Sequence, residues 1–450
     1  MITDTRNAVR SITSGPRTVI MQGPTGVGKT VTMAAMAKTS MGMGNRVIFT
    51  VHRRELLHQS CRALDSWNIR HGIIASGYPM DDAMMHVASI NTLVRRMQKI
   101  QPPDLIIVDE AHHAMAGQWA QVIRHWPGAT VVGLTATPQR LDGKGLGELF
   151  QRLVIGPTTS WLIENKYLSP FRLFAPPNGI DTSSVKSAMG DFKKDQLAVV
   201  CDKNSITGNA VEHYVRHASG KRAIVFCVSI KHAEHVAEEF QKNGIEAIHI
   251  TGMDDRDHRD DVMRKFAAGE IKVLCSVDLI SEGFDVPAVE AIIMLRPTQS
   301  LTLYLQQIGR ALRYIPGKTA IILDHAGNCN RHGMPDAART WSLAGKQKKS
   351  TKDADDISIV TCSQCYAVFR PAPECPVCGF EQAVNPRKIQ EVDGDLVEID
   401  PKELARIRAR QISGAHTFDE LEVIRKARGY KPGWTEHIMK SRRQRYAERA

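Results

Sequence analysis

The sequence predicts two tandem lobes, each built on a doubly wound parallel α/β sheet. In the first third of the chain, short apolar runs rich in β-branched residues alternate with helix-like stretches, which is typical of buried parallel strands. A second series of such runs follows further along the chain. The first series is TVIM (18–21), RVIFTV (46–51), LIIVDE (105–110) and TVVGLT (130–135), and the second is AIVFCV (223–228), EAIHI (246–250), IKVLCS (271–276), AIIML (291–295) and TAIILD (319–324).

One helix of the second lobe is visible in the pattern between its first two strands. The stretch KHAEHVAEEFQKN (231–243) places Ala233, Val236, Ala237 and Phe240 on one helical face. An amphipathic helix between two strands is the crossover that a parallel sheet requires.

Composition shifts suggest where the parts begin and end. Gly-Pro, Ser-Pro and Pro-Pro pairs mark irregular structure between the lobes, and the polar stretch GKQKKSTKDADDIS (345–358) has the character of a linker. We expect a first lobe at 1–165, a connection at 166–210, a second lobe at 211–335, a linker at 336–358, a zinc-binding module at 359–385 and a basic tail at 386–450.

The composition is that of an ordinary soluble protein, with 42% hydrophobic and 24% charged residues. No apolar run approaches the ~18 residues that span a bilayer, and the N-terminus lacks a secretory layout. Five of the nine cysteines are scattered and four are clustered, which favours a reducing compartment and one metal site over a disulfide framework. We therefore expect a cytoplasmic protein of a bacterium or a phage-infected host, with no membrane partner.

The net charge of +11 is unevenly distributed, because residues 401–450 alone contribute +7. A basic tail indicates a polyanionic partner such as nucleic acid. A solvated terminus explains the charge of the tail equally well.

The stretch GPTGVGKT (23–30) fits the phosphate-binding pattern G-x-x-x-x-G-K-[ST]. Its glycines, Gly23, Gly26 and Gly28, together with Thr25, let backbone N–H groups approach phosphate oxygens. Lys29 then reaches the β- and γ-phosphates, and the Thr30 hydroxyl is a ligand for Mg²⁺. The pattern predicts an ATP site.

An acidic pair ends the third apolar run, in LIIVDEAH (105–112). At the carboxyl end of a parallel strand, Asp109 is placed to hold Mg²⁺, and Glu110 is placed to orient or deprotonate the attacking water. The neighbouring His112 and His113 are a poor metal pair, because adjacent side chains point in different directions.

The order of motifs resembles that of DEAH-box superfamily 2 helicases, over about residues 6 to 330. The tetrad Asp109–His112 is followed by TATP (135–138), SEGFDVP (281–287) and QQIGRALR (306–313), and is preceded by TVHRREL (50–56) and SINTL (89–93). The resemblance implies two RecA-like lobes that close on ATP and move along nucleic acid.

The resemblance also implies roles for individual residues. Thr135 and Thr137 would couple hydrolysis to lobe movement, and Gly283 and Asp285 would contact the nucleotide. The contacts with nucleic acid would come from Thr50, Arg53, Ser89, Asn91, Thr92, Ser229 and Ser276.

The stretch QQIGRALR also carries a physical argument of its own. Gln306, Arg310 and Arg313 are spaced by four and three residues, so one helical face could present all three. Placed across the cleft from the phosphate loop, the two arginines would stabilise charge on the transferring phosphoryl group, an effect worth roughly 10³–10⁵ in rate.

Within the superfamily, the chain most resembles RadD-type DNA-repair helicases of bacteria and phages. The shared stretches are LTATPQRL (134–141), LRPTQSLTLYLQQIGRALR (295–313) and LDHAGN (323–328), with a cysteine cluster beyond the second lobe. RadD carries Cys at the position of Ala111. These relatives also read adenine with a glutamine upstream of the phosphate loop, whereas this chain has no glutamine before Gln22. We expect relaxed nucleotide selectivity.

The cysteine cluster has the pattern C-x₂-C-x₉-C-x₂-C, formed by Cys362, Cys365, Cys375 and Cys378. Two such turns supply the four thiolates of a closed tetrahedral Zn²⁺ site. A redox pair is the competing interpretation.

In the tail, Tyr430 and Trp434 lie among cationic residues in ARGYKPGW (427–434). Such aromatics could stack on bases while the cations meet phosphates. A small helical domain with Trp434 in its core is the alternative.

These patterns favour an ATP-dependent DNA helicase or translocase acting on single-stranded or branched DNA in repair, recombination or replication, with proteins of those processes as partners. An RNA helicase and the motor component of a restriction system remain alternatives.

Overall fold

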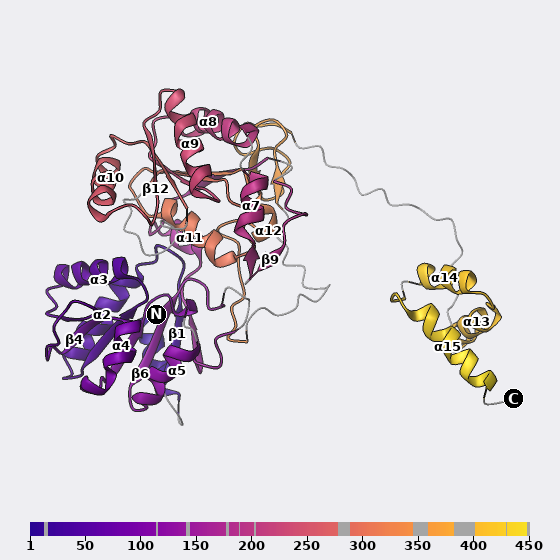
Figure 1. Ribbon diagram of the computed structural model, residues 1–450, viewed down its shortest axis with the longest axis horizontal. Coiled ribbons are helices and arrows are strands. Elements are labelled where there is room, and N and C mark those ends of the chain that lie inside the picture. Colours follow the sequence, from indigo (N-terminus) through magenta and orange to yellow (C-terminus); the bar gives the residue numbers. More distant parts are fainter. Residues whose placement is uncertain are drawn as a thin grey trace. The chain divides into compact units, whose positions relative to one another are not determined.

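The computed structural model describes residues 1–12, 17–113, 116–140, 145–176, 180–188, 190–201, 204–277, 289–344, 359–381, 401–428 and 430–447. The chain divides into one compact unit up to Val384 and a second from Asn385 onward. The first unit contains two α/β lobes (Figure 1), as the sequence predicts. Among the described residues, no helix is long and apolar enough to cross a membrane.

The first lobe is a seven-stranded parallel sheet with the order β3-β4-β2-β5-β6-β1-β7. The four strands expected from the apolar runs are β1, β2, β5 and β6. β3, β4 and β7, which the apolar runs did not predict, complete the sheet. The strands span Thr18–Gln22 (β1), Val47–Val51 (β2), Gly72–Ile74 (β3), Met85–Ser89 (β4), Leu105–Val108 (β5), Thr130–Thr135 (β6) and Arg152–Ile155 (β7).

Helices cover both faces of this sheet, which explains why its strands are apolar on both sides. Val19 and Met21 face α1, α2 and α3, whereas Ile20, between them, faces α4 and α5. The helices of this lobe span Ile2–Arg10 (α1), Lys29–Met41 (α2), Arg54–Ser66 (α3), Ile90–Arg96 (α4), Met97–Lys99 (η1), Ala111–His113 (η2) and Ala116–His125 (α5). The next helix, Thr159–Glu164 (α6), packs its Leu162 into the core of the second lobe.

The second lobe is an eight-stranded sheet with the order β12-β13-β11-β14-β15-β8-β17-β16. Its five predicted strands are β11 to β15, all parallel. β8 joins them from the segment expected to connect the lobes, so part of that segment belongs to this sheet. The strands span Phe171–Phe174 (β8), Ala223–Phe226 (β11), Ala247–Ile250 (β12), Val273–Ser276 (β13), Ala291–Met294 (β14), Ala320–Asp324 (β15), Val360–Thr361 (β16) and Ala367–Phe369 (β17).

Both faces of the second sheet are also covered. Ala233, Val236, Ala237 and Phe240 of α9 are buried against it, as the helical pattern predicts. The opposite face packs against α10 and α11. The helices of this lobe span Lys194–Cys201 (α7), Asn204–Ala218 (α8), Ile230–Lys242 (α9), Arg256–Ala268 (α10), Leu301–Leu312 (α11) and Asn328–His332 (α12).

The cysteine module extends the second sheet. β17 pairs antiparallel with β8, and β16 pairs antiparallel with β17. Cys362, Phe369 and Cys375 share the hydrophobic core that α8 and α9 cover. The module is therefore continuous with the second lobe.

A short hairpin of Ser187–Ala188 (β9) and Asp191–Phe192 (β10) ties the connecting segment to the second lobe. The Asp191 carboxylate pairs with Arg296 at 3.2 Å and accepts hydrogen bonds from the Thr298 hydroxyl and the Gln299 N–H. This network holds the loop that precedes α11.

The described residues of the second unit form three helices, so the tail is helical as predicted. They span Pro401–Gly414 (α13), Phe418–Ala427 (α14) and Trp434–Ala447 (α15). Thr417 and Glu420 form a capping box at the start of α14. Trp434 is partly buried at the start of α15, with its ring 4.7 Å from that of Tyr430. The aromatic pair therefore contributes to packing within this small helical unit.

Candidate active site

The phosphate loop joins β1 to α2 and leaves the start of that helix open. Gly26 and Gly28 adopt φ values of 91° and 87°, in the left-handed region that favours glycine. Gly28 is the N-cap of α2, and no side chain caps the helix there. The first backbone N–H groups of α2 are thus available to an anion, beside Lys29 and Thr30.

The two acids lie at the carboxyl end of β5, as predicted. Glu110 has φ 44°, a strained conformation for a residue with a side chain, and such strain is concentrated at functional sites. Burial, together with the charge of Glu110, raises the pKa of Asp109 to about 7, while nearby Lys29 acts in the opposite direction. A buried carboxylate of this kind is a good ligand for a cation, because the charge of the cation offsets the cost of removing the carboxylate from water.

A chain of buried polar contacts leads from Glu110 to the second lobe. His112 Nδ1 lies 3.3 Å from the Glu110 carboxylate and 2.9 Å from Thr135 Oγ1. The Thr135 hydroxyl donates to the Thr137 carbonyl at 2.9 Å and accepts from the Thr137 N–H. Thr137 Oγ1 then lies 2.7 Å from Thr302 Oγ1, on α11. The acidic pair is thereby linked to the helix that carries the candidate arginines.

The sequence did not single out Thr302. Its position four residues before Gln306 places both on one face of α11. Helical spacing from Gln306 could have identified it, but its partner Thr137 comes from the other lobe.

Helix α11 lies directly against the phosphate loop. A Cβ built at Gly309 would lie 2.3 Å from Thr25 Cβ, so only glycine permits this approach. Gln306 and Arg310 are buried, at 3% and 8% exposure. The helix ends at Leu312, so Arg313 follows it in extended backbone instead of continuing the helical face. The Lys318 ammonium donates to the carbonyls of Ala311 and Arg313 and so satisfies backbone acceptors at the end of the helix.

Buried polar atoms without a protein partner show that the residues fit a bound nucleotide. Thr25 Oγ1 and both side-chain atoms of Gln306 are enclosed and make no hydrogen bond. Such groups cost free energy unless a ligand or water satisfies them. They lie on the phosphate loop and on the helix that packs against it, so the cleft between the lobes is the candidate active site.

Two family models match stretches of this chain. Residues 2–140 match that of the type III restriction enzyme res subunit, and residues 206–315 match the helicase conserved C-terminal domain. A 51.5 kDa protein of a Lactococcus phage is 35% identical over 370 residues, covering 81% of this chain and 78% of the phage protein. The chain belongs to the superfamily 2 helicases.

More distant relatives are longer proteins. The Saccharomyces cerevisiae protein IRC3, named as an ATP-dependent helicase, is 30% identical over 68% of this chain and 48% of its own length. The endonuclease subunit of the Escherichia coli type I restriction enzyme EcoKI is 25% identical over 69% of this chain and 32% of its own length. The chain thus spans about half or less of the length of these relatives.

Solved structures share the fold. A fragment named as an HsdR subunit of a Vibrio vulnificus type I restriction enzyme superposes with a TM-score of 0.58 at 19% identity, covering 74% of this chain and 64% of that one.

As a member of this superfamily, the protein is an ATP-hydrolysing enzyme that depends on nucleic acid.

Several expected nucleic-acid contacts of this helicase lie at the carboxyl ends of strands, where α/β sheets bind ligands. Arg53 is the N-cap of α3, Ser89 is the N-cap of α4, and the exposed Asn91 accepts a hydrogen bond from Gln118. Thr92 lies one residue further along α4 and is partly buried. Ser229 uses its hydroxyl to cap α9.

Two of the expected contacts are buried. Thr50 is fully enclosed in β2, where its hydroxyl donates to the Ile107 carbonyl at 3.2 Å, and Ser276 is 1% exposed at the end of β13. In this structure neither side chain reaches the surface, because both strands have covered faces. Gly283 and Asp285 lie outside the described residues.

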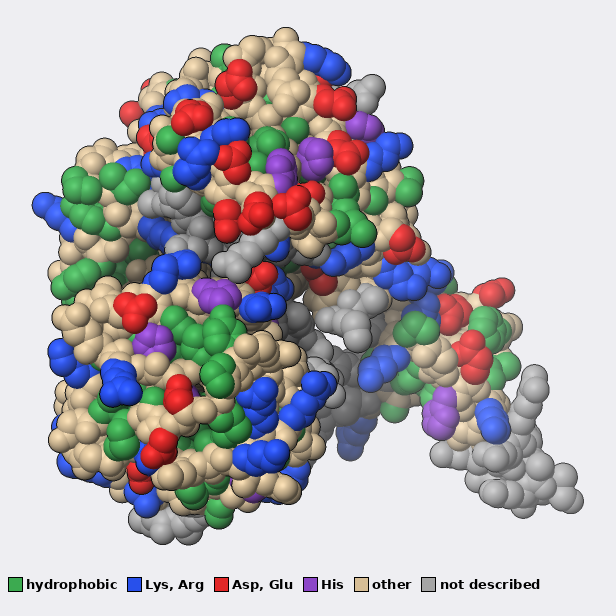
Figure 2. Space-filling model, turned by 60° about the vertical axis from the view of Figure 1, so that its left-hand side comes forward, with side chains coloured by type: hydrophobic (Ala, Val, Ile, Leu, Met, Phe, Trp, Pro, Cys, Tyr) green, Lys and Arg blue, Asp and Glu red, His purple; other side chains and the backbone are tan. Residues whose placement is uncertain are grey.

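The charged surface of this helicase is mixed. On the face drawn in Figure 2, Lys and Arg side chains alternate with Asp and Glu on both lobes. Outside residues 401–450 the chain carries only +4 of its +11 net charge. A contact with nucleic acid on this face would therefore depend on individual loops rather than on a continuous basic surface.

The four clustered cysteines converge as a metal site requires. Their Sγ atoms all lie within 4.8 Å of one another, and the pairs Cys362–Cys378 and Cys365–Cys375 are each 3.7 Å apart. A tetrahedron with Zn–S bonds of about 2.3 Å has sulfur–sulfur edges of about 3.8 Å. The donor set and its spacing fit zinc.

Proposed function

We propose that the protein is an ATP-dependent DNA translocase or helicase. The observation that supports this proposal is the contact of Gly309 with Thr25, which joins α11, the helix that carries Gln306 and Arg310, to the phosphate loop. A nucleotide held there would bridge the lobes, and its hydrolysis would release them.

In the proposed reaction, Lys29 and the open N-terminus of α2 hold the phosphates, and Thr30 and Asp109 hold Mg²⁺. Mg²⁺ bound there would supply positive charge that offsets the negative charge of the phosphates. Glu110 orients a water molecule and takes its proton as the water attacks the γ-phosphorus and the bond to the β-phosphate breaks. Arg310 and Arg313 stabilise the charge that develops on the departing groups.

Support for DNA comes from the relatives. EcoKI and EcoAI, both named as type I restriction endonucleases, are similar over more than two thirds of this chain. The solved type ISP restriction-modification enzyme LlaBIII, which has the same fold with a TM-score of 0.52, is described as bound to DNA. These relatives favour a role as the motor of a restriction system, and a role in DNA repair, recombination or replication stays the prediction from the sequence.

An RNA helicase is the second candidate. The Schizosaccharomyces pombe ATP-dependent RNA helicase dbp4 is 30% identical over 32% of this chain, and the solved S. cerevisiae Dbp5 structure, with a TM-score of 0.50, is described as bound to RNA.

The test is an ATPase panel with single-stranded DNA, duplex DNA, forked DNA and RNA of matched sequence. We expect DNA to stimulate hydrolysis at least tenfold more than RNA. Lys29→Ala should abolish that stimulation, whereas Lys38→Ala, exposed on the same helix, should retain it. Equal or greater stimulation by RNA would reject the DNA assignment.

We also propose that the cysteine module holds one structural zinc ion. Closed Cys₄ sites stabilise the fold around them, and here that fold includes the edge of the second sheet. Elemental analysis of the purified chain should give one zinc per chain, and Cys375→Ser should reduce this to near zero. An iron content equal to the expected zinc would reject the assignment.

A further inference from the structure

The chain turns back sharply just after α11. In the stretch IPGK (315–318), the Lys318 N–H donates to the Ile315 carbonyl at 3.1 Å, and Gly317 has φ 74°. Proline at the second position of a turn and glycine with positive φ at the third are typical of a type II turn. This turn brings Lys318 back to the end of α11.

The Lys318 ammonium is buried there among backbone carbonyls. The residue is 9% exposed, and its Nζ donates to the carbonyls of Val289 at 3.2 Å, of Ala311 at 2.7 Å and of Arg313. An ammonium has three N–H donors and no acceptor, so all three donors are engaged. Hydrogen bonds of this kind offset the cost of burying the charge, and the carboxyl end of a helix favours a cation. The carbonyls at the end of α11 therefore form a site for a charged lysine.

The segment that connects the lobes also holds Arg313. The Ser169 N–H donates to the Leu312 carbonyl at 2.8 Å, and the Ser169 hydroxyl donates to the Arg313 carbonyl at 3.2 Å. Leu168 and Arg313 form an antiparallel bridge. The Arg313 carbonyl thus accepts from both Lys318 and Ser169, which come from different parts of the chain.

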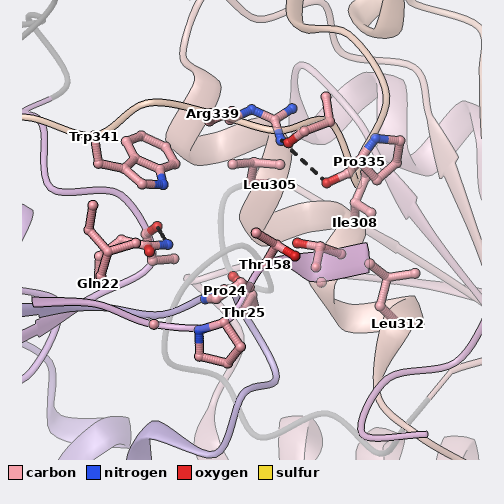
Figure 3. Close-up of a pocket in the computed structure, with 17 residues that line it drawn as sticks. Gln22, Pro24, Thr25, Thr158, Leu305, Ile308, Leu312, Pro335, Arg339 and Trp341 are labelled. Atoms are coloured by element: carbon pink, nitrogen blue, oxygen red, sulfur yellow. Dashed lines mark hydrogen bonds between the residues drawn. The ribbon is translucent and has the colours of Figure 1, made fainter. Parts of the chain in front are cut away.

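The same segment places Arg313 beside the phosphate loop. Leu168 is fully buried, and a Cβ built at Gly26 would lie 2.8 Å from its side chain. Leu312, the residue before Arg313, lines the same pocket as Thr25 (Figure 3). The backbone of Arg313 is therefore held close to the phosphate loop, although Arg313 does not continue the helical face of α11.

We propose that Lys318 is a positioning residue for Arg313. By holding the Arg313 carbonyl where the helix ends, it sets the direction in which the guanidinium projects toward the phosphates. The inference rests on the proposed function, because it requires Arg313 to act on the nucleotide. A misplacement of about 1 Å in a reacting group can cost about 10²-fold in rate, so a residue that touches no substrate can control kcat.

The first test separates kcat from KM. Lys318→Met removes the three donors at similar side-chain length, and we expect kcat to fall by about 10- to 100-fold while KM for ATP changes by less than about twofold. Ser169→Ala removes the second donor to Arg313 and should lower kcat by about 2- to 12-fold, the range expected for one hydrogen bond. Lys221→Met, at a lysine of the same lobe whose side chain is 37% exposed, is the matched control and should change neither quantity.

A double-mutant comparison distinguishes positioning from a structural role. In an Arg313→Ala background the guanidinium is absent, so Lys318→Met should lower kcat further by less than about twofold. An equal loss in both backgrounds, or a normal kcat in Lys318→Met, would overturn the proposal. Single-turnover hydrolysis measures the slow variants, and Ser169→Ala supplies the same comparison if Lys318→Met does not fold.

The pH dependence of kcat offers an independent readout. Burial lowers the pKa of Lys318 to about 8, while the Glu290 carboxylate opposes this shift and Arg313 and Arg222 add to it. Lys221 lies 3.8 Å from the Glu290 carboxylate. A neutral amine has only two N–H donors, so one of the three carbonyls loses its partner as pH rises through the pKa of Lys318. We expect kcat to fall over this range.

Lys318→Arg separates this decline from instability at high pH. A guanidinium stays charged, so the decline in kcat should be absent from this variant. The pKa of Lys318 is lowered on folding from 10.5 to about 8, so this group raises the free energy of unfolding between those pH values and unfolding linked to it does not explain the decline. A decline of equal size in the wild-type and Lys318→Arg chains would overturn the role of the lysine charge.

Each rate is measured without nucleic acid, with DNA and with RNA. If DNA fails to stimulate hydrolysis, the proposed function fails, but the ratio of variant to wild-type rates under the other conditions still tests Lys318. If Lys318→Met keeps a normal kcat, the positioning role fails, and stimulation of the wild-type chain by DNA is unaffected.

Discussion

The two lobes share a doubly wound sheet, but α2 of the first lobe begins differently from α9 and α11 of the second. In the first lobe, α2 starts at Gly28 with no side-chain cap. In the second lobe, α9 and α11 start at Ser229 and Ser300, and each serine hydroxyl accepts a hydrogen bond from the helix backbone. A capped helix has already satisfied donors that an uncapped one offers to an anion.

The loop before α11 shows the same contrast in detail. The Thr298 N–H donates to Asn328 Oδ1 at 2.9 Å, the Gln299 N–H donates to Asp191 at 2.7 Å, and the Ser300 N–H donates to Thr298 Oγ1 at 3.0 Å. Protein groups therefore satisfy the backbone N–H groups that precede α11, whereas the start of α2 has no side-chain cap. In the proposed reaction, the first lobe binds the nucleotide and the second lobe presents side chains to it.

If the second lobe acts through its side chains, removal of Arg310 should have the largest effect. Arg310→Ala should lower the DNA-stimulated ATPase rate by about 10³–10⁵-fold, because a positively charged group opposite the phosphates stabilises the transition state. Arg264→Ala, on the exposed surface of α10, is the control and should be silent. Steady-state ATPase assays measure both, and near-normal activity in Arg310→Ala would exclude the proposed role.

The first lobe should depend similarly on its general base. Glu110→Gln keeps the shape of the side chain but cannot accept a proton, so hydrolysis should fall by about 10²–10⁴-fold. Binding of ATP, measured by equilibrium dialysis, should persist. Glu148→Gln, exposed in the same lobe, should leave both quantities intact. Loss of ATP binding in Glu110→Gln would point instead to a role in holding the nucleotide.

The first lobe also buries the Asp109 carboxyl beside the charge of Glu110, which should lower its stability without metal. The pKa of Asp109 is raised from 3.8 to about 7, so the folded carboxyl keeps its proton at pH values where the unfolded one loses it. This group therefore lowers the free energy of unfolding as pH rises from about 4 to 7. Without Mg²⁺, Asp109→Asn should raise Tm at pH 8 and have little effect at pH 4. An equal rise at both pH values would contradict the assignment.

The contact between Thr137 and Thr302 joins the two lobes and should transmit closure. Thr302→Val removes the hydroxyl with little change in volume, and we expect DNA-stimulated hydrolysis to fall by about tenfold, equivalent to about 1.4 kcal/mol. Thr302→Ser retains the hydroxyl and should preserve most of the activity. If the serine variant is as impaired as the valine variant, packing rather than the hydrogen bond is responsible.

The helix caps offer the smallest and most direct test of the comparison. Ser300→Ala should destabilise the protein by about 0.5–2 kcal/mol through loss of the α11 cap, and KM for ATP should stay unchanged. At the other lobe, Gly28→Ala should instead raise KM for ATP, because φ 87° strains any other residue there. Urea unfolding and ATPase titrations distinguish the two outcomes.

The sequence alone located the candidate site residues of the first lobe. The phosphate loop and the acidic pair are local patterns, in which neighbouring residues along the chain form the site, so Lys29, Asp109 and Glu110 could be named in advance. The buried strands were also predictable, because both faces of a doubly wound sheet are covered and the runs are apolar throughout. The four cysteines were found because they, too, form a local pattern along the chain.

What only the tertiary structure decided is how distant segments meet. The sequence placed Arg313 on the helix with Gln306, but that helix ends at Leu312, where Lys318 donates a hydrogen bond to the Ala311 carbonyl. Thr50 belongs to a motif typical of nucleic-acid contact, yet its strand lies inside the sheet. The pairing of Thr137 with Thr302 joins residues 165 positions apart. Such contacts depend on the packing of one lobe against the other, and the spacing of residues along the chain does not encode them.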